Sequence, residues 1–234
     1  SYSVTGVQTC ALPISSLLDR LKTGSIDAET LRGNLSRMND RLLFLERFID
    51  EMRSYSQATP AERRRERIVD VVNEEKSAVL DNLKSRSVET DSVTWSFDVP
   101  ENVTAEIARH QIVAALIHIL KNAFEAFDPG NSGPKKIDVR GRNVGEDVEI
   151  AVTDNGPGIA EDDLSDIRLF RPGTSTKMNQ GGTGFGLPTA SRYVSTHGGS
   201  LVIESEEGQG ATVTISLPID RGEDADEDPS VSDR

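Results

Sequence analysis

The stretch Asp154-Asn155-Gly156-Pro157-Gly158-Ile159 decides the interpretation of this chain, because it turns the backbone sharply at the end of a predicted strand. Its glycines allow the backbone to lie close to a flat ligand. The carboxylate of Asp154 can accept a hydrogen bond from such a ligand. The stretch therefore predicts one wall of a binding site.

A second glycine-rich stretch, Gly182-Thr183-Gly184-Phe185-Gly186-Leu187, opens a predicted helix. It leaves unpaired N–H groups at the helix start, where the helix dipole also favours anions such as phosphate groups. Asn122 lies within a predicted apolar helix and offers an amide oxygen that suits Mg²⁺. A carboxylate that can bind a nucleobase, a glycine loop that can bind phosphates and an amide that can bind a metal ion together predict a Mg-nucleotide site.

Hydrophobic periodicity around these stretches predicts a mixed α+β layer sandwich. Helices are expected over residues 27–56, 68–83, 107–127 and 187–197, and strands over residues 93–99, 136–140, 148–153, 201–205 and 211–217. The basic run Arg63-Arg64-Arg65-Glu66-Arg67 is interpreted as a solvent-facing linker.

The expected helix at residues 27–56 carries a heptad seam. Its apolar residues are Leu31, Leu35, Met38, Leu42, Leu45, Ile49 and Met52. Such a seam favours partner helices. With residues 16–21 as an antiparallel neighbour, it predicts a homodimer through a four-helix bundle. The alternative is that the helix packs on its own domain.

The ends and the charge of the chain set further limits. Residues 1–14 resemble a translated sequencing adapter rather than a signal peptide, so we expect the natural sequence to begin near Ser15. Residues 15–58 are expected to be a partial helical hairpin, 60–218 a catalytic domain, and 219–234 an acidic, disordered tail. The net charge of −13 argues against nucleic-acid binding. The sequence lacks an apolar run of roughly 18 residues, so no membrane contact is expected within it.

Four stretches occur in the order and spacing of the sequence boxes of sensor histidine kinases. The chain resembles this family in its N box, first glycine box, F box and second glycine box, at residues 120–126, 154–159, 169–177 and 182–187. Residues 198–218 resemble the family's closing hairpin. The resemblance implies a GHKL (Bergerat-type) α/β sandwich, preceded by part of a dimerisation and phosphotransfer bundle.

The resemblance also implies roles for individual residues. Asp154 would accept a hydrogen bond from the adenine amino group, and Asn122 would coordinate Mg²⁺ at the ATP phosphates. Residues 160–181 would form a mobile lid. The other implied ATP-binding residues are Gly156, Gly158, Ile159, Thr176, Lys177, Gly182, Thr183, Gly184, Phe185, Gly186 and Leu187. The ordinary alternatives are a turn cap for Asp154, a buried polar side chain for Asn122 and a solvated lysine for Lys177.

The histidines bear on the reaction. His118 occupies the position, four residues before Asn122, at which related hydrolases carry a glutamate base, so this position resembles the kinases; the alternative is a core histidine. The three histidines, His110, His118 and His197, all lie within the expected catalytic domain. The phosphoacceptor histidine of the family is therefore missing: either it was lost with the natural N-terminus, which the truncated first helix favours, or the protein never had one.

The function implied by the resemblance is transfer of the ATP γ-phosphate to a histidine on the first bundle helix, and then to the receiver domain of a response regulator. This bacterial kinase core is expected to be cytoplasmic, whether or not its parent protein is membrane-anchored. The alternatives are a GHKL regulatory module that binds ATP without phosphotransfer, and a gyrase-like ATP hydrolase.

Overall fold

The computed structural model describes residues 27–56, 60–74, 93–127, 133–167, 170–173 and 182–219. The chain divides into two compact units, Ser1–Asp50 and Glu51–Arg234. The expected adapter, the first hairpin helix, the acidic tail from residue 220 on, and the lid residues Thr176 and Lys177 lie outside the described residues.

Helix α2 (Ala28–Ser56) confirms the long helix expected over residues 27–56. Asp27 caps its start, because one carboxylate oxygen accepts the Thr30 N–H at 2.7 Å and the other accepts the Thr30 hydroxyl at 2.7 Å. Most of the heptad seam is exposed, with Leu35, Leu42 and Ile49 at 51, 63 and 55%, whereas its members at positions 31 and 38 are half-buried. Dimerisation through this seam stays a prediction.

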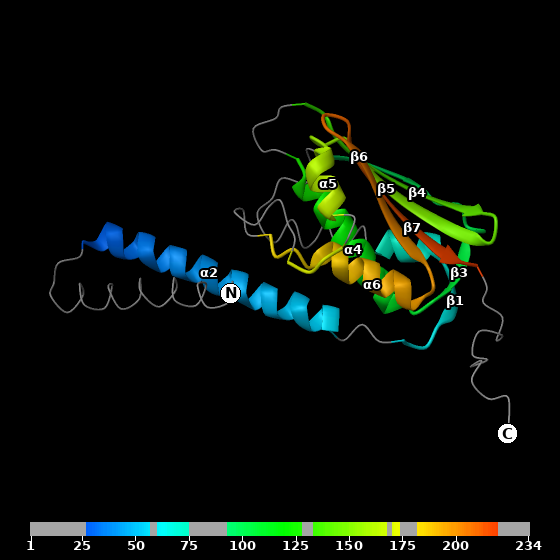
Figure 1. The fold of residues 1–234 in the computed structure, drawn as a ribbon, viewed down its shortest axis with the longest axis horizontal. Coiled ribbons are helices and arrows are strands. Elements are labelled where there is room, and N and C mark those ends of the chain that lie inside the picture. Colours follow the sequence, from blue (N-terminus) through cyan, green and yellow to red (C-terminus); the bar gives the residue numbers. More distant parts are fainter. Residues whose placement is uncertain are drawn as a thin grey trace, which may run out of the picture. The chain divides into compact units, whose positions relative to one another are not determined.

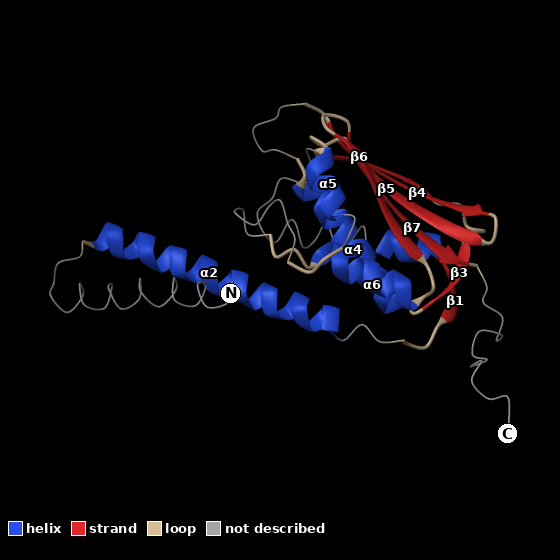
Figure 2. Cartoon of the chain, viewed as in Figure 1, coloured by secondary structure: helices blue, strands red, loops and turns tan. Residues whose placement is uncertain are grey.

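The second unit contains a five-stranded sheet in the order β2-β4-β5-β7-β6. The strands are β2 (Val93–Asp98), β4 (Lys135–Val144), β5 (Asp147–Asp154), β6 (Ser200–Glu206) and β7 (Gly210–Pro218). The β2–β4 pair is parallel and the other pairs are antiparallel. Helices α4 (Arg109–Glu125), α5 (Glu161–Ile167) and α6 (Gly186–Thr196) lie on one side of the sheet, as Figures 1 and 2 show. The α+β sandwich is confirmed.

The core between the sheet and the helices is aliphatic. Alternate residues of the strands point inward, so the sheet presents one apolar face to the helices. The fully buried side chains include Ile137, Ile150, Ile203 and Ile215 from the sheet and Ile112, Leu116 and Ile119 from α4. This packing fixes α4 against the sheet and so fixes the side chains that α4 carries at its ends.

Two parts of the fold differ from the expectation. Residues of the basic run form strand β1 (Arg64–Arg67), which pairs antiparallel with β3 (Thr104–Ile107), so the linker interpretation was wrong. Within the expected lid, residues 161–167 form helix α5, held by the fully buried Leu164. Both elements are short and mostly polar, so periodicity gave no signal for them.

His197 is a buried packing residue at the end of α6. Its Nε2 accepts the Ala108 N–H at 2.9 Å, so its Nδ1 carries the proton and donates to the Tyr193 carbonyl at 2.7 Å. Burial lowers the pKa of His197 below its ordinary value; the bond to Tyr193 opposes this, while Arg63 and His110 add to the lowering. The neutral ring therefore joins the start of α4 to the end of α6.

We expect the unfolding free energy to decrease as the pH is lowered, because of this ring. A lowered pKa in the folded state means that the unfolded chain binds the proton more strongly, so the stabilisation is complete above about pH 6.5 and is lost below it. His197→Ala should cost about 1–3 kcal/mol at pH 7.5, since it leaves the Ala108 N–H unpaired. It should also flatten the dependence between pH 7.5 and 5.5, measured by urea denaturation. His110→Ala, at an exposed position, should leave most of the slope; an unchanged slope in His197→Ala would contradict this account.

Candidate functional site

The loop Asp154–Ile159 leaves the sheet at the end of β5. The Asn155 side chain holds the beginning of the loop through two hydrogen bonds. The Asn155 side chain accepts the Lys136 N–H at 2.6 Å and donates to the Pro134 carbonyl at 2.7 Å. Asp154 is buried, at 6% exposure, and its Oδ1 accepts the Gly156 N–H at 2.8 Å. These bonds fix both the turn and the orientation of the carboxylate.

The loop requires glycine at Gly158 because of the hairpin between β6 and β7. Gly158 has φ +71°, and a Cβ there would lie 2.0 Å from the Glu206 carbonyl oxygen. The Gly208 N–H donates to the Pro157 carbonyl at 2.7 Å. The hairpin therefore holds the second side of the loop by direct backbone contact.

Helix α4 joins the predicted parts of the site. At its C-terminal end, a Cβ on Gly156 would lie 3.2 Å from the Ala126 Cβ, so the glycine turn passes beside α4. One turn before the half-buried Asn122, the ring of His118 lies against Gly186, where a Cβ would be 3.3 Å from Nδ1. The structure thus brings both glycine stretches to the helix that carries Asn122.

The second glycine stretch leads into α6. Gly184 has φ +73°, and its carbonyl accepts the Gly173 N–H at 3.0 Å. Phe185 is buried, and it caps α6 without a side-chain hydrogen bond to the first turn. The N–H groups at this helix start are suited to an anion. Gly182, Gly186 and Leu187 are half-buried around them.

Glu51, the first residue of the second unit, lies beside this stretch. Its carboxylate accepts a hydrogen bond from the hydroxyl of the buried Thr183, and it lies 3.9 Å from the Lys121 ammonium. Lys121 also lies 3.9 Å from Glu125. Burial lowers the pKa of His118; the Glu51 carboxylate opposes this and Lys121 adds to it, so His118 is neutral near pH 7. No local sequence signal pointed to Glu51, because its partners lie far along the chain.

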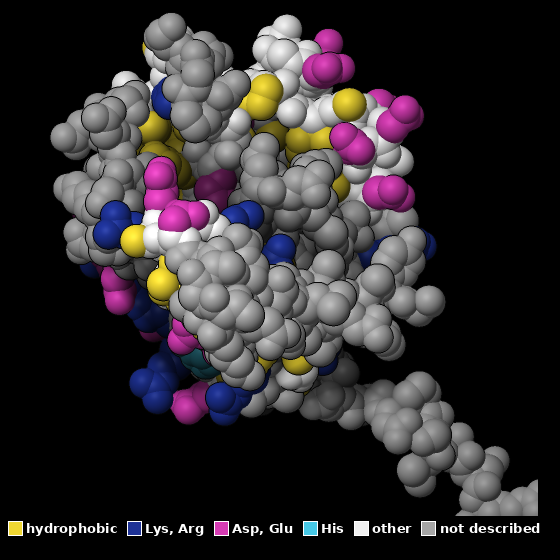
Figure 3. Space-filling view, turned by 90° about the vertical axis from the view of Figure 1, so that its left-hand side faces the viewer, with side chains coloured by type: hydrophobic (Ala, Val, Ile, Leu, Met, Phe, Trp, Pro, Cys, Tyr) yellow, Lys and Arg dark blue, Asp and Glu magenta, His cyan; other side chains and the backbone are white. Residues whose placement is uncertain are grey.

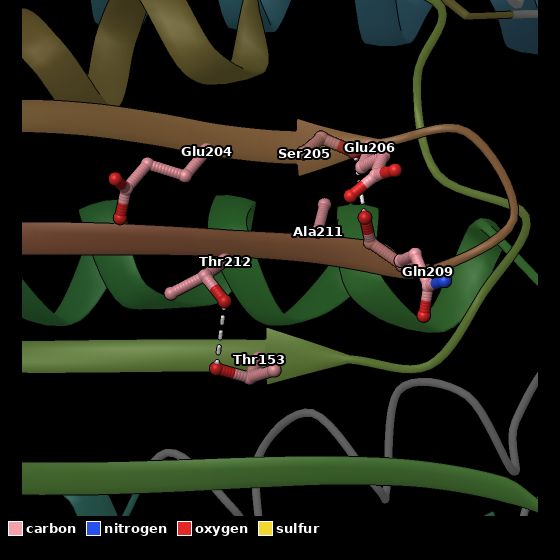
Figure 4. A pocket seen from close by; sticks show the side chains of 8 residues that line it. Thr153, Glu204, Ser205, Glu206, Gln209, Ala211 and Thr212 are labelled. Atoms are coloured by element: carbon pink, nitrogen blue, oxygen red, sulfur yellow. Dashed lines mark hydrogen bonds between the residues drawn. The ribbon is translucent and has the colours of Figure 1, made fainter.

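A hollow of about 330 Å³ lies beside the hairpin, at the ends of β5, β6 and β7 (Figure 4). Its lining includes Thr153, Glu204, Ser205, Gln209 and Thr212, and Thr153 and Thr212 share a hydrogen bond of 3.0 Å. None of the predicted ATP-binding residues lines it. Ser205 connects this hollow to the predicted ATP-binding residues, because its Oγ accepts the Ile159 N–H at 2.9 Å.

The described surface carries mixed charge. Figure 3 shows Lys and Arg side chains scattered among acidic ones on the face that it presents. Among the described residues, no group of three or more His, Cys, Asp and Glu side chains is arranged to hold a metal ion. None of the described helices is both long and apolar enough to cross a membrane.

Part of this chain matches a known protein family, and its fold is similar to that of solved structures. Residues 108–221 match the family described as histidine kinase-, DNA gyrase B- and HSP90-like ATPase. The chain is 29% identical to the sensor-like histidine kinase SenX3 of Mycolicibacterium smegmatis, over 88% of this chain and 53% of that protein. It is 38% identical to the sensor histidine kinase ZraS of Escherichia coli, over 47% of this chain and 22% of that protein. The chain thus spans at most about half the length of these two relatives.

A solved structure of similar fold is that of histidine kinase ThkA in complex with the response regulator protein TrrA. It has a TM-score of 0.66 and 20% identity, over 93% of this chain and 61% of the ThkA chain. At this identity the likeness shows the fold.

The close approach at Gly158 predicts a difference between two glycine substitutions. Gly158 and Gly145 both have positive φ, but a Cβ on Gly145 would meet nothing within 4 Å. Gly145→Ala should therefore cost roughly 1–2 kcal/mol of unfolding free energy, the strain of the left-handed conformation. Gly158→Ala should cost more than about 3 kcal/mol, because the Glu206 carbonyl must also move. Equal losses in denaturant titrations would contradict the assigned contact.

Proposed function

We propose that this chain is the kinase core of a two-component sensor histidine kinase, from the premise that its residues 108–221 match the family described as histidine kinase-, DNA gyrase B- and HSP90-like ATPase. The observation that carries the proposal is the meeting of both glycine stretches at α4, through Gly156 beside Ala126 and Gly186 beside His118. A purine base and its phosphates would then lie at opposite ends of one short stretch of α4.

ATP is the nucleotide that this domain family implies, and the proposed contacts follow from the geometry. The Asp154 carboxylate, held by the Gly156 N–H, accepts a hydrogen bond from the adenine amino group. Gly156, Gly158 and Ile159 form the backbone wall beside the base. The phosphates lie at the start of α6, where Gly182, Thr183, Gly184, Phe185, Gly186 and Leu187 supply backbone N–H groups or shape the loop. Thr176 and Lys177 are proposed to close over them.

Magnesium is proposed to bind through Asn122 and the phosphates. Asn122 is half-buried on the face of the domain reached by both glycine stretches, and its amide oxygen is a hard ligand of the kind Mg²⁺ prefers. Mg²⁺ commonly takes one or two protein ligands and completes its shell with phosphate oxygens and water. A site with a single amide ligand is consistent with that habit. The ion would neutralise charge on the transferring phosphate.

The reaction proposed is phosphotransfer rather than hydrolysis. The residue four positions before Asn122 is His118, which is neutral, packs against Gly186 and lies near Glu51 and Lys121. Related hydrolases carry a glutamate as the base for water at this position, and this chain has no carboxylate there. The site therefore positions ATP while leaving attack to an incoming imidazole.

Partners of the kinase core follow from this chemistry. A similar fold, that of ThkA, is known in complex with a response regulator, and we propose a receiver domain as the partner here. The exposed seam of α2 is proposed to form a homodimer through a helical bundle, because a seam of this length gains stability only when it is buried. The core is proposed to work in the cytoplasm, where ATP is available.

Two substitutions should separate the base and metal parts of nucleotide binding. Asp154→Asn should weaken ADP binding about ten- to hundredfold with or without Mg²⁺, the factor expected for loss of a hydrogen bond to a charged acceptor. Asn122→Ala should instead reduce the gain in affinity that Mg²⁺ gives. Calorimetric titration with ADP, with Mg²⁺ and with EDTA, measures both.

Asp147→Asn is the matched control, since Asp147 is exposed at the opposite end of the same strand. It should bind ADP like the unchanged chain. Wild-type affinity in Asp154→Asn would refute the role of that carboxylate. A Mg²⁺ effect that survives in Asn122→Ala would remove the metal assignment.

Phosphotransfer should need a histidine from outside this chain. His197 is buried with both ring nitrogens bonded, and His118 lies one turn from Asn122 on the same helix, where in-line attack on the γ-phosphate is not feasible. With labelled ATP alone, the chain should therefore gain no acid-labile phosphate. A separate helical hairpin that bears a histidine should become labelled and then pass the label to a receiver domain.

Histidine→Gln in the added hairpin is the control and should abolish labelling. Label on His118 in mass spectra would contradict the proposed geometry. Steady release of free phosphate without transfer would favour the gyrase-like hydrolase, and tight binding without either activity would favour a regulatory module.

A further inference from the structure

Ser205 is a side chain of the β6–β7 hairpin that bonds the loop Asp154–Ile159. Two other contacts between them, Gly208 with Pro157 and Gly158 with Glu206, are made by backbone atoms. Ser205 is half-buried at the end of β6, and its Oγ accepts the Ile159 N–H at 2.9 Å. A change of this one side chain can therefore test the connection.

The hydroxyl of Ser205 also makes a bond within the hairpin. It donates to the Gly210 carbonyl at 2.6 Å, a bond at the hairpin end that Figure 4 draws. Gly210 in turn lies against the beginning of the loop, because a Cβ there would be 2.0 Å from the Asp154 carbonyl oxygen. One hydroxyl thus links Ile159, at the exit of the loop, to the strand that abuts Asp154, at its entrance.

We propose that Ser205 is a positioning residue for adenine recognition, an inference that rests on the proposed nucleotide site. It makes no contact with the base in this account. It keeps the distance between the Asp154 carboxylate and the backbone of Ile159, and so keeps the acceptor aligned with the exocyclic amine. Without the hydroxyl, the Ile159 N–H and the Gly210 carbonyl each lose a partner, and the loop gains alternative conformations.

The consequence is a loss of discrimination between bases rather than of phosphate binding. ADP carries the 6-amino donor, whereas IDP carries a carbonyl at that position and offers Asp154 no amine. In the wild-type chain, ADP should bind more tightly than IDP. In Ser205→Ala, the affinity for ADP should fall about tenfold, which corresponds to ~1.4 kcal/mol, while that for IDP changes little. The ratio of the two affinities is the readout, because a general loss of stability would not change it.

Two further variants complete the experiment on the full chain. Ser205→Thr keeps the hydroxyl and should restore the ADP preference. Thr153→Val removes a hydroxyl that lines the same hollow and bonds Thr212, but not the loop, so it should keep the wild-type ratio. Amide exchange adds a direct measurement: the Ile159 N–H should exchange faster in Ser205→Ala and at the wild-type rate in Thr153→Val.

The outcomes separate this inference from the proposed function. If the wild-type chain binds ADP more tightly than IDP and Ser205→Ala keeps that ratio, the positioning role is refuted and the nucleotide site stands. An equal shift in Thr153→Val would also refute it. Failure of the wild-type chain to bind ADP would overturn the proposed function, and this inference with it.

Discussion

Two backbone contacts leave no room for a side chain, and the geometry of the candidate site depends on them. A Cβ on Gly158 would lie 2.0 Å from the Glu206 carbonyl oxygen, and a Cβ on Gly210 would lie 2.0 Å from that of Asp154. The loop after β5 and the hairpin between β6 and β7 therefore fit together only through glycine. Since both are anchored in one sheet, the position of the Asp154 carboxylate follows from strand pairing.

Helix α4 fixes the positions of the other candidate site residues, Asn122 and His118. Its inner face is fixed by buried aliphatic packing, including Ile112, Leu116 and Ile119. Buried, close-packed aliphatic side chains hold a helix in place more firmly than polar contacts at the surface do. Asn122 and His118 therefore keep their places relative to the loop and to Gly186.

Much of this arrangement was predictable from the sequence, and the rest was hidden for physical reasons. The five strands of the main sheet and helices α4 and α6 follow from periodicity, since each buries an apolar face, and α2 follows from its heptad spacing. Strand β1 was missed because arginine side chains project outward while its backbone pairs with β3. Glu51 and Ser205 were missed because their partners, Thr183 and Ile159, are remote in sequence. The ATP-binding roles of the predicted residues stay predictions.

In the proposed site, backbone N–H groups contact the phosphates, whereas a side chain contacts the base. The phosphate end of this proposed site would consist of glycine N–H groups that any nucleoside phosphate satisfies, so it would give little selectivity among bases. Selectivity among bases would then fall on the Asp154 carboxylate, which accepts the Gly156 N–H and whose loop is held by bonds of Asn155 and Ser205. The proposed choice between transfer and hydrolysis would depend on another element, helix α4, at His118. Base recognition and reaction type can therefore change independently, while the sheet and the glycine contacts remain the same.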